Sequence, residues 1–339
     1  MPVIFREVAQ TFGLNVDAAG ILGAAKIHGT VDGIRLEMAS TENGLRAVVW
    51  FDPPLDLGLD ISTRHFAFAD SMGTPRFFGD SNWDDEIATT CDDPGRARKL
   101  LEGAVRRHVL KLNSTSNNFT MTDLCAKVEI ALPYQEQLMS LVPTLIQLGK
   151  DVATDRLGVP PPRELKLYAK VLKEMAQKVP LQLSNVPLKA EGIMRETAIK
   201  LEFTRTGVER YQAELLAFPQ TGAQREGFLV KPETLVDRAR VLFGAQDVQV
   251  GDAPFDKAFL IQSGDPERAV AALDADVRAL LLELRTVFDE VEIRGNVLAA
   301  RGPSAKLPAP RLEAVLEAAS TIVPQIARAS GGVFSGPYR

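Results

Sequence analysis

The chain has 339 residues, of which 45% are hydrophobic and 24% charged, and its formal net charge is −5. This length predicts two domains, and the composition is sufficient for each of them to bury a core. The acidic balance argues against a protein that binds nucleic acid along its whole length, and no run reaches the roughly 18 apolar residues of a membrane helix.

Hydrophobic periodicity predicts a series of elements in residues 1–157. A short amphipathic helix over 4–12 comes first. Five strands are predicted next, over 24–31, 33–40, 45–51, 57–63 and 86–91. Asp93-Pro94 then begins a helix, with the aspartate as its cap and the proline at its first position. One or two strands over 119–131 and a long apolar helix over 133–154 end this half.

The same order returns in residues 164–330, beginning with a helix over 164–178. Strands are predicted over 189–195, 198–205, 212–218, 227–230, 246–250 and 258–263. Asp265-Pro266 begins a helix with an apolar stripe at a spacing near 3.6, made of Val270, Leu273, Val277, Leu281 and Leu284. Strand residues near 289–300 and a long helix over 310–329 follow. Three prolines in residues 158–163 predict a semi-rigid linker, and residues 331–339 a flexible tail.

The two halves also match residue by residue. Residues 79–112 and 251–284 align at a constant offset of 172 without a gap, and 12 of the 34 pairs are identical. Unrelated segments of ordinary composition would share roughly one residue in fifteen. The sequence therefore predicts a tandem duplication of one α+β domain. Each copy is expected to form a mainly antiparallel sheet with helices packed on one face and a long C-terminal helix.

One stretch of the second copy has a recognisable pattern. It holds the pair Phe255-Asp256, then Phe259, then Gly264-Asp265-Pro266-Glu267 at the start of a leucine-rich helix. This stretch resembles a bacterial domain family of unknown function, and the resemblance covers about half of each copy. The first copy departs from the pattern at Glu86-Ile87. Because the family has no established activity, the resemblance implies a fold and no function.

An element of the form Gly-Asp-x-x-aromatic-Asp occurs once in each copy. Its acidic pairs are Asp80 with Asp84, and Asp252 with Asp256. Two carboxylates at this spacing could share a metal ion or act as an acid/base pair. The favoured interpretation is a turn in which glycine adopts a positive φ, the aspartates bind the local backbone, and the aromatic residue anchors the turn in the core.

A basic cluster stands out in the acidic first copy and could bind an anion near a helix start; it contains Arg96, Arg98, Lys99, Arg106 and Arg107. A solvated helix face would have the same composition. Arg106 and Arg278 are identical in the two copies, which favours a shared structural pairing with an aspartate of the preceding turn.

Residues 66–83 combine aromatic side chains with glycine, serine and aspartate. We assign a partner-binding role to the aromatic residues of this segment, which are Phe66, Phe68, Phe77, Phe78 and Trp83. Exposed aromatic residues on a loop are typical anchors of protein interfaces. The alternative is that they fold under the loop into the core.

The sequence contains no spacing typical of a zinc, serine-nucleophile or nucleotide site, so no catalytic residue, metal site or cofactor is predicted. With 2 cysteines, no disulfide framework and no secretion signal, a cytoplasmic location is expected. The leading hypothesis is a non-enzymatic adaptor or assembly component with a protein partner. The alternatives are a small-ligand or lipid-like binding module with a groove under the long helices, and a metal-dependent hydrolase-like enzyme that uses the Asp pairs. Neither the sequence nor its composition indicates an oligomeric state.

Overall fold

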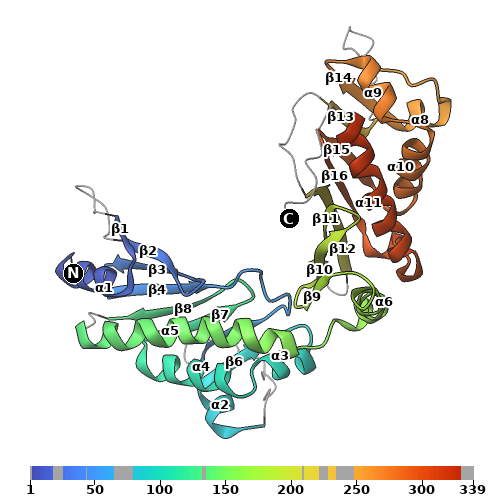
Figure 1. Cartoon of the computed structure of the whole chain (residues 1–339). Helices are drawn as coiled ribbons and strands as arrows, with labels where there is room; N and C mark the ends of the chain where they lie inside the picture. Colours follow the sequence, from blue (N-terminus) through green and yellow to red (C-terminus); the bar gives the residue numbers. More distant parts are fainter. Residues whose placement is uncertain are drawn as a thin grey trace. The chain divides into compact units, whose positions relative to one another are not determined.

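The computed structural model of the chain describes residues 2–17, 26–42, 44–64, 79–131, 135–207, 210–220, 228–233 and 248–329. The chain divides into two compact units. The first contains Met1–Pro162 with Asn185–Pro187, and the second contains Arg163–Ser184 with Leu188–Arg339. Each unit is an α+β fold built on one eight-stranded antiparallel sheet (Figure 1).

The sheet of the first unit has the strand order β1-β2-β3-β4-β8-β7-β5-β6. Its strands are β1 (Asn15–Asp17), β2 (Lys26–Val31), β3 (Ile34–Thr41), β4 (Gly44–Trp50), β5 (Asp60–Thr63), β6 (Ile87–Thr90), β7 (Asn118–Thr122) and β8 (Cys125–Ile130). Its α-helices are α1 (Pro2–Phe12), α2 (Ser81–Glu86), α3 (Pro94–Leu100), α4 (Ala104–Thr115) and α5 (Gln135–Asp155). A 3₁₀ turn, η3 (Arg156–Gly158), follows α5.

The sheet of the second unit has the order β9-β10-β11-β12-β16-β15-β13-β14. Its strands are β9 (Leu181–Asn185), β10 (Leu188–Met194), β11 (Thr197–Gly207), β12 (Arg210–Pro219), β13 (Phe228–Pro232), β14 (Phe259–Ser263), β15 (Glu290–Arg294) and β16 (Val297–Pro303). Its described helices are α6 (Lys166–Ala176), α8 (Ala253–Ala258), α9 (Pro266–Ala272), α10 (Ala275–Val287) and α11 (Leu312–Ala329). Short 3₁₀ turns are η4 (Arg163–Leu165), η5 (Ser304–Lys306) and η6 (Ala309–Arg311).

The two sheets have the same topology, strand for strand. The first four strands of each unit are neighbours in sequence order, the eighth lies beside the fourth, and the seventh, fifth and sixth complete the sheet. The described helices occupy corresponding positions in the element order of the two units. The predicted fold class and the duplicated arrangement are therefore confirmed.

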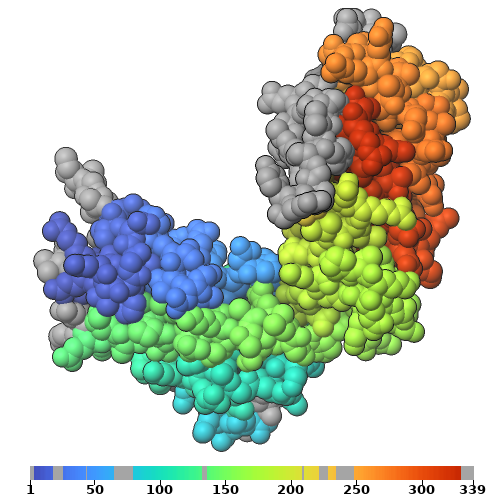
Figure 2. All heavy atoms as spheres, viewed as in Figure 1, coloured from blue at the N-terminus to red at the C-terminus, as the bar shows by residue number. Residues whose placement is uncertain are grey.

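Each core lies between one face of the sheet and the long C-terminal helix. Alternate residues of β11 are buried, as a sheet with one helix-covered face requires. In the first unit α5 approaches β3 so closely that a Cβ at Gly149 would lie 2.6 Å from Cγ2 of Ile34. Figure 2 shows the blue N-terminal segment lying against the green helix α5, a contact between elements distant in sequence.

The helix predicted after each Asp-Pro pair is two helices, which corrects that prediction. In the first copy Gly103, with φ of 68°, separates α3 from α4. In the second copy Asp274 begins α10 as a new cap, and its side chain accepts the N–H of Val277 at 2.9 Å. The apolar spacing continues across both breaks, so periodicity alone does not reveal them. Val270 of the predicted stripe is 40% exposed on α9.

Three other expectations have mixed outcomes. The short edge strands β1 and β9 were not predicted. Residues 248–250 of the predicted strand over 246–250 form no strand, although the N–H of Val248 bonds the carbonyl of Ile261 at 3.0 Å. The predicted tail over 331–339 lies outside the described residues.

Candidate functional site

The Gly-Asp-x-x-aromatic-Asp element of the first copy forms the capped start of α2. Gly79 has φ of 64°, and the Asp80 carboxylate accepts the N–H groups of Asn82 and Trp83 at 3.0 and 3.4 Å. Arg106, which extends from α4, forms an ion pair with Asp80. Its guanidinium carbon lies 5.8 Å from the centre of the Trp83 ring system. One aspartate therefore ties α2 to α4.

The second copy repeats this arrangement. Gly251 has φ of 75°, and the Asp252 carboxylate accepts the N–H of Phe255 at 3.3 Å. Nε of Arg278, on α10, lies 2.9 Å from Oδ2 of Asp252. Arg278 also donates to the carbonyl of Leu273 at 2.7 Å. The predicted pairing of the two identical arginines with an aspartate of the preceding turn is confirmed.

The second aspartate of each element also bonds the backbone. Oδ2 of Asp84 accepts the N–H of Asp80 at 3.0 Å, and Oδ2 of Asp256 accepts the N–H of Asp252 at 3.1 Å. The hydrogen bond from Arg106 holds the pKa of Asp80 below its usual value, and Arg278 does the same for Asp252. An acid/base carboxyl would need its pKa raised toward neutrality. Both elements have the geometry of the favoured structural interpretation.

This pairing predicts an acid-dependent loss of stability. The folded-state pKa of Asp80 lies below the ordinary 3.8, so the ion pair contributes stability above that value and loses it as the pH falls through the folded pKa. We expect Arg106→Gln to lower the melting temperature at about pH 6 and to have little effect near about pH 2. Arg107→Gln, on the exposed side of the same helix, is the matched control. A deficit that stays equal at both pH values would contradict a role for the ion pair.

The five residues of the basic cluster differ in their burial and in their hydrogen-bond partners. Arg96 is buried and donates to the carbonyls of Pro160 and Asp56 at 2.9 and 3.2 Å. Lys99 binds Glu102 at 2.9 Å, and Arg106 binds Asp80. Arg98 and Arg107 are exposed. Arg96 and Arg106 thus hold elements of the fold together, Lys99 is an exposed residue paired with Glu102, and an anion site at the exposed residues stays a prediction.

The aromatic segment is described only in part. Phe66, Phe68, Phe77 and Phe78 lie outside the described residues. Trp83 is 0% exposed, and its indole N–H donates to Oγ1 of Thr89 at 3.0 Å. Trp83 therefore belongs to the core and presents no surface to a partner. The turn of α2 directs Trp83 and Asp84 inward, whereas Ser81 and Asn82 are exposed.

The described residues contain two free cysteines and potential metal ligands of the His, Cys, Asp and Glu types. Within the described ranges no three His, Cys, Asp or Glu side chains are grouped as a metal site would require. Cys91 and Cys125 are free. Burial, with Asp92 and Asp93 nearby, raises the pKa of the Cys91 thiol to about 11, so this thiol stays protonated at neutral pH. No described helix is long and apolar enough to cross a membrane.

The face of the second sheet that points away from α11 carries a row of charged residues. The register places five of them side by side across five strands: Lys189, Glu202, Glu214, Arg301 and Glu290. Arg301 binds Glu214 at 2.7 Å. In the next row Lys200 binds Glu202 along the same strand at 2.7 Å. These pairings satisfy most of the charges within the sheet.

An apolar row lies at one end of the same face. Ile193 pairs with Ala198, and Ala198 pairs with Phe218, so the three side chains are neighbours on β10, β11 and β12. Ile193 is 39% and Phe218 44% exposed. We call Ile193, Ala198 and Phe218 the apolar row. Sequence reasoning missed it, although apolar residues at the polar positions of an alternating strand would have been the signal.

A pocket of about 590 Å³ opens where β12 begins and β16 ends. Its lining comes from the ends of β11, β12 and β16, from η5 and from the turn before β15, and it includes Thr206, Arg210, Tyr211, Gln212, Glu290 and Ser304. The lining mixes charged, polar and apolar groups. This pocket is at the end of the sheet rather than under the long helix, where a lipid-like groove was expected.

Comparison with known proteins gives little further information. No protein-family model and no curated protein matches the chain, so the resemblance of the Gly251–Leu284 stretch to a bacterial family stays a prediction. Among solved structures, the chain is similar to the crystal structure of the mycobacterial trehalose monomycolate transport factor A, TtfA. The identity is 9%, the TM-score is 0.32, and the match covers 46% of this chain and 94% of that one. A likeness at this level supports no inference on fold or function.

Proposed function

We propose that this protein is a non-enzymatic interaction component, an adaptor or assembly factor, which binds a protein partner on the outer sheet face of its second copy. The observation that carries this proposal is the apolar row. Two large apolar side chains, each about two-fifths exposed, lie on the same face of the sheet on β10 and β12, on either side of Ala198 on β11. Apolar residues grouped in this way are typical of the centre of a protein interface.

The surroundings of the row suit the rim of such an interface. Next to it lie Glu191, Lys200 and Leu216, and the charged row follows. Lys189 and Glu191 form an ion pair along β10, and Lys200 pairs with Glu202 along β11. The hydrogen bond that Lys200 donates to Glu202 raises the pKa of Lys200, which favours its charged form. Polar groups that are already paired can border the apolar centre of an interface without needing a hydrogen-bond partner from the bound protein.

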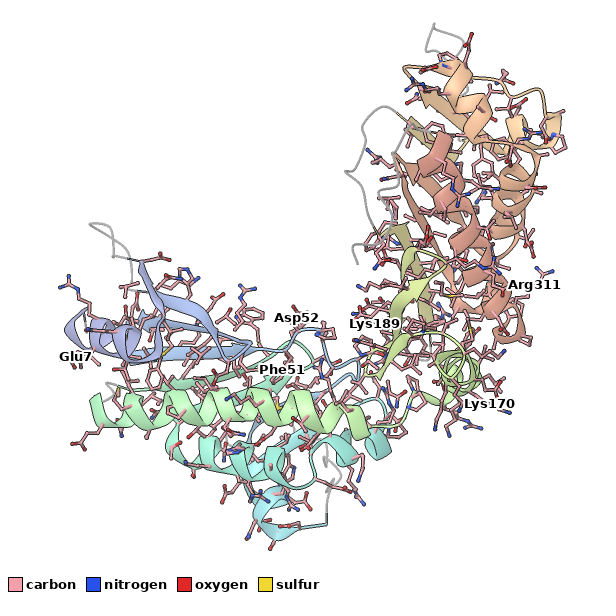
Figure 3. All side chains as sticks on the ribbon, viewed as in Figure 1. Glu7, Phe51, Asp52, Lys170, Lys189 and Arg311 are labelled. Carbon is pink, nitrogen blue, oxygen red and sulfur yellow. The ribbon has the colours of Figure 1, made fainter. Side chains whose placement is uncertain are left out.

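The first copy lacks the apolar row. Ile34–Met38 aligns with Ile199–Phe203, Leu36 pairs with Val49, and Leu201 pairs with Leu215. By position, Asp52 corresponds to Phe218. Asp52, labelled in Figure 3, is exposed on the segment after β4. The two copies therefore keep one fold and differ at this surface, which fits a binding role retained by only one of them.

The copies differ in a second respect on the same face. In the first copy Trp50, which corresponds to Leu216, is half-buried and lies under Arg35, whose guanidinium carbon is 5.2 Å from the ring centre. Glu37 in turn binds Arg35 at 2.7 Å and Lys26 at 3.1 Å. This cluster covers the aromatic ring with charged groups. At these corresponding positions of the described sheets, the exposed apolar row is therefore found in the second copy.

The proposal is tested by purifying the protein, expressed at its native level in its own cells, together with any bound partner. A binding assay with the purified partner follows. The double variant Ile193→Ser/Phe218→Ser removes the apolar row without placing a charge on the face. We expect this variant to lose a stoichiometric partner that the wild type retains, with binding weakened at least about tenfold. Val270→Ser, which alters an exposed apolar residue on α9, is the matched control and is expected to retain the partner.

Two other outcomes are informative. A partner that survives in the double variant and disappears in Phe77→Ser/Phe78→Ser would move the interface to the aromatic segment of the first copy. If the wild type yields no stoichiometric partner, the adaptor function is rejected.

A further inference from the structure

The pocket of the second copy has the size of a small-molecule site. Its volume of about 590 Å³ falls within the range of roughly 300–1,000 Å³ that is typical of ligand pockets. It lies on the outer face at the end of the sheet, whereas the apolar row lies toward the other end of β12. The pocket therefore represents a separate surface from the one proposed for a protein partner.

Two charged groups of the pocket lining, Arg301 and Asp289, form ion pairs, and Arg210 and Glu290 form none within the described residues. Arg301 binds Glu214 at 2.7 Å, and Lys306 binds Asp289 at 2.5 Å. The Arg210 guanidinium makes no ion pair or hydrogen bond with the described part of the chain. The Glu290 carboxylate makes none there either, although its charge acts on Arg301, its cross-strand neighbour. The pocket thus offers one cation without an ion pair, and one carboxylate whose charged cross-strand neighbour, Arg301, is already bound to Glu214.

The sheet register determines the distance between Arg210 and Glu290. Glu290 pairs with Arg301, Arg301 pairs with Glu214, and Arg210 lies four residues before Glu214 on the same face. The Cα atoms are therefore separated by about 10 Å across two strands and about 13 Å along the strand. With both side chains extended toward each other, the distance left between the Arg210 guanidinium and the Glu290 carboxylate is longer than a single amino acid. Each residue of an extended peptide spans about 3.4 Å.

We propose that this pocket binds a short peptide of two or three residues with free ends, its carboxylate on Arg210 and its ammonium group on Glu290. The arginine fork matches a carboxylate in a bidentate geometry. Between the charged ends, the Thr206 and Ser304 hydroxyls and the Gln212 amide line the pocket and can bond peptide groups.

The test is a calorimetric titration of the full chain at low salt with trialanine, N-acetyl-trialanine and trialanine amide. We expect trialanine to bind, and each capped form to bind at least about tenfold more weakly, because each lacks one charge. In Arg210→Gln the amide and the free peptide should bind equally. In Glu290→Gln the acetylated and the free peptide should bind equally.

Two controls separate this result from other causes. Arg294→Gln changes an arginine on the same face outside the pocket lining and is expected to leave binding unchanged. Ile193→Ser/Phe218→Ser should also bind trialanine normally, which distinguishes this site from the proposed partner surface. Failure of the wild type to bind at up to about 10 mM peptide overturns the proposal. Equal discrimination between capped and free peptides in the wild type and both pocket variants overturns it as well.

Discussion

Replacing Trp83 with alanine is expected to lower the free energy of unfolding of the first copy by about 3–5 kcal/mol. The Trp83 side chain is fully buried, and its N–H bonds the hydroxyl of Thr89, which is itself only 6% exposed. The substitution leaves a large cavity and a buried hydroxyl without its partner. Urea denaturation measures the effect, and the fluorescence of Trp50 reports on the first copy because both tryptophans of the chain lie there.

Trp50→Ala is the matched control for this experiment. Trp50 is half-buried on the outer face of β4, so its loss removes less buried surface and opens no enclosed cavity. We expect its cost to be less than half that of Trp83→Ala. Equal costs for the two substitutions would contradict the assignment of Trp83 to the core.

Replacing Asp123 with alanine is expected to cost about 3 kcal/mol, from about 1 kcal/mol for each of three backbone N–H groups that lose their acceptor. The Asp123 carboxylate accepts the N–H groups of Leu57, Gly58 and Leu59 at 2.8 to 3.1 Å. It therefore fixes the segment before β5 to the turn between β7 and β8. Denaturation measures the total cost, and hydrogen exchange at these three amides locates it.

Asp123→Asn tests whether these N–H groups need both carboxylate oxygens or only one acceptor oxygen. The amide keeps one acceptor oxygen, so an intermediate loss of stability is expected. The amide of Ile61, which lies within β5, should exchange as in the wild type in the asparagine variant. Unchanged protection of Leu57, Gly58 and Leu59 in Asp123→Ala would refute this role.

Local chemistry explains why the capped elements could be predicted. Gly79 and Asp80 act within a few residues of their own position, because a positive φ and a cap need only adjacent backbone groups. The match of Arg106 with Arg278 added one longer contact, because two copies of a fold preserve a side chain that joins two of its helices. The burial of Trp83 agrees with its place as the aromatic residue of the Gly-Asp-x-x-aromatic-Asp turn. The prediction that Trp83 binds a partner was wrong because it grouped Trp83 with the aromatic residues of the preceding segment.

Other features were missed because their signal is short or depends on distant segments. β1 has three residues and β9 has five, too few for a period of two to be distinguished from chance. The carboxylate of Asp123 meets its partners across 64 to 66 residues, and nothing near Asp123 indicates them. The apolar row needs the register of three strands, and the pocket needs the ends of four.

The sequence by itself determined the duplication, the α+β class, the order of the main elements and the two capped turns. These depend on periodicity, on the direct match between copies and on interactions within a few residues. Only the tertiary structure decided which charges neutralise each other and which apolar residues stay exposed. It alone brought Arg210 and Glu290 to one pocket and placed Ile193 and Phe218 on either side of Ala198. Cross-strand neighbours are set by register, and register arises from packing the whole sheet against its helices.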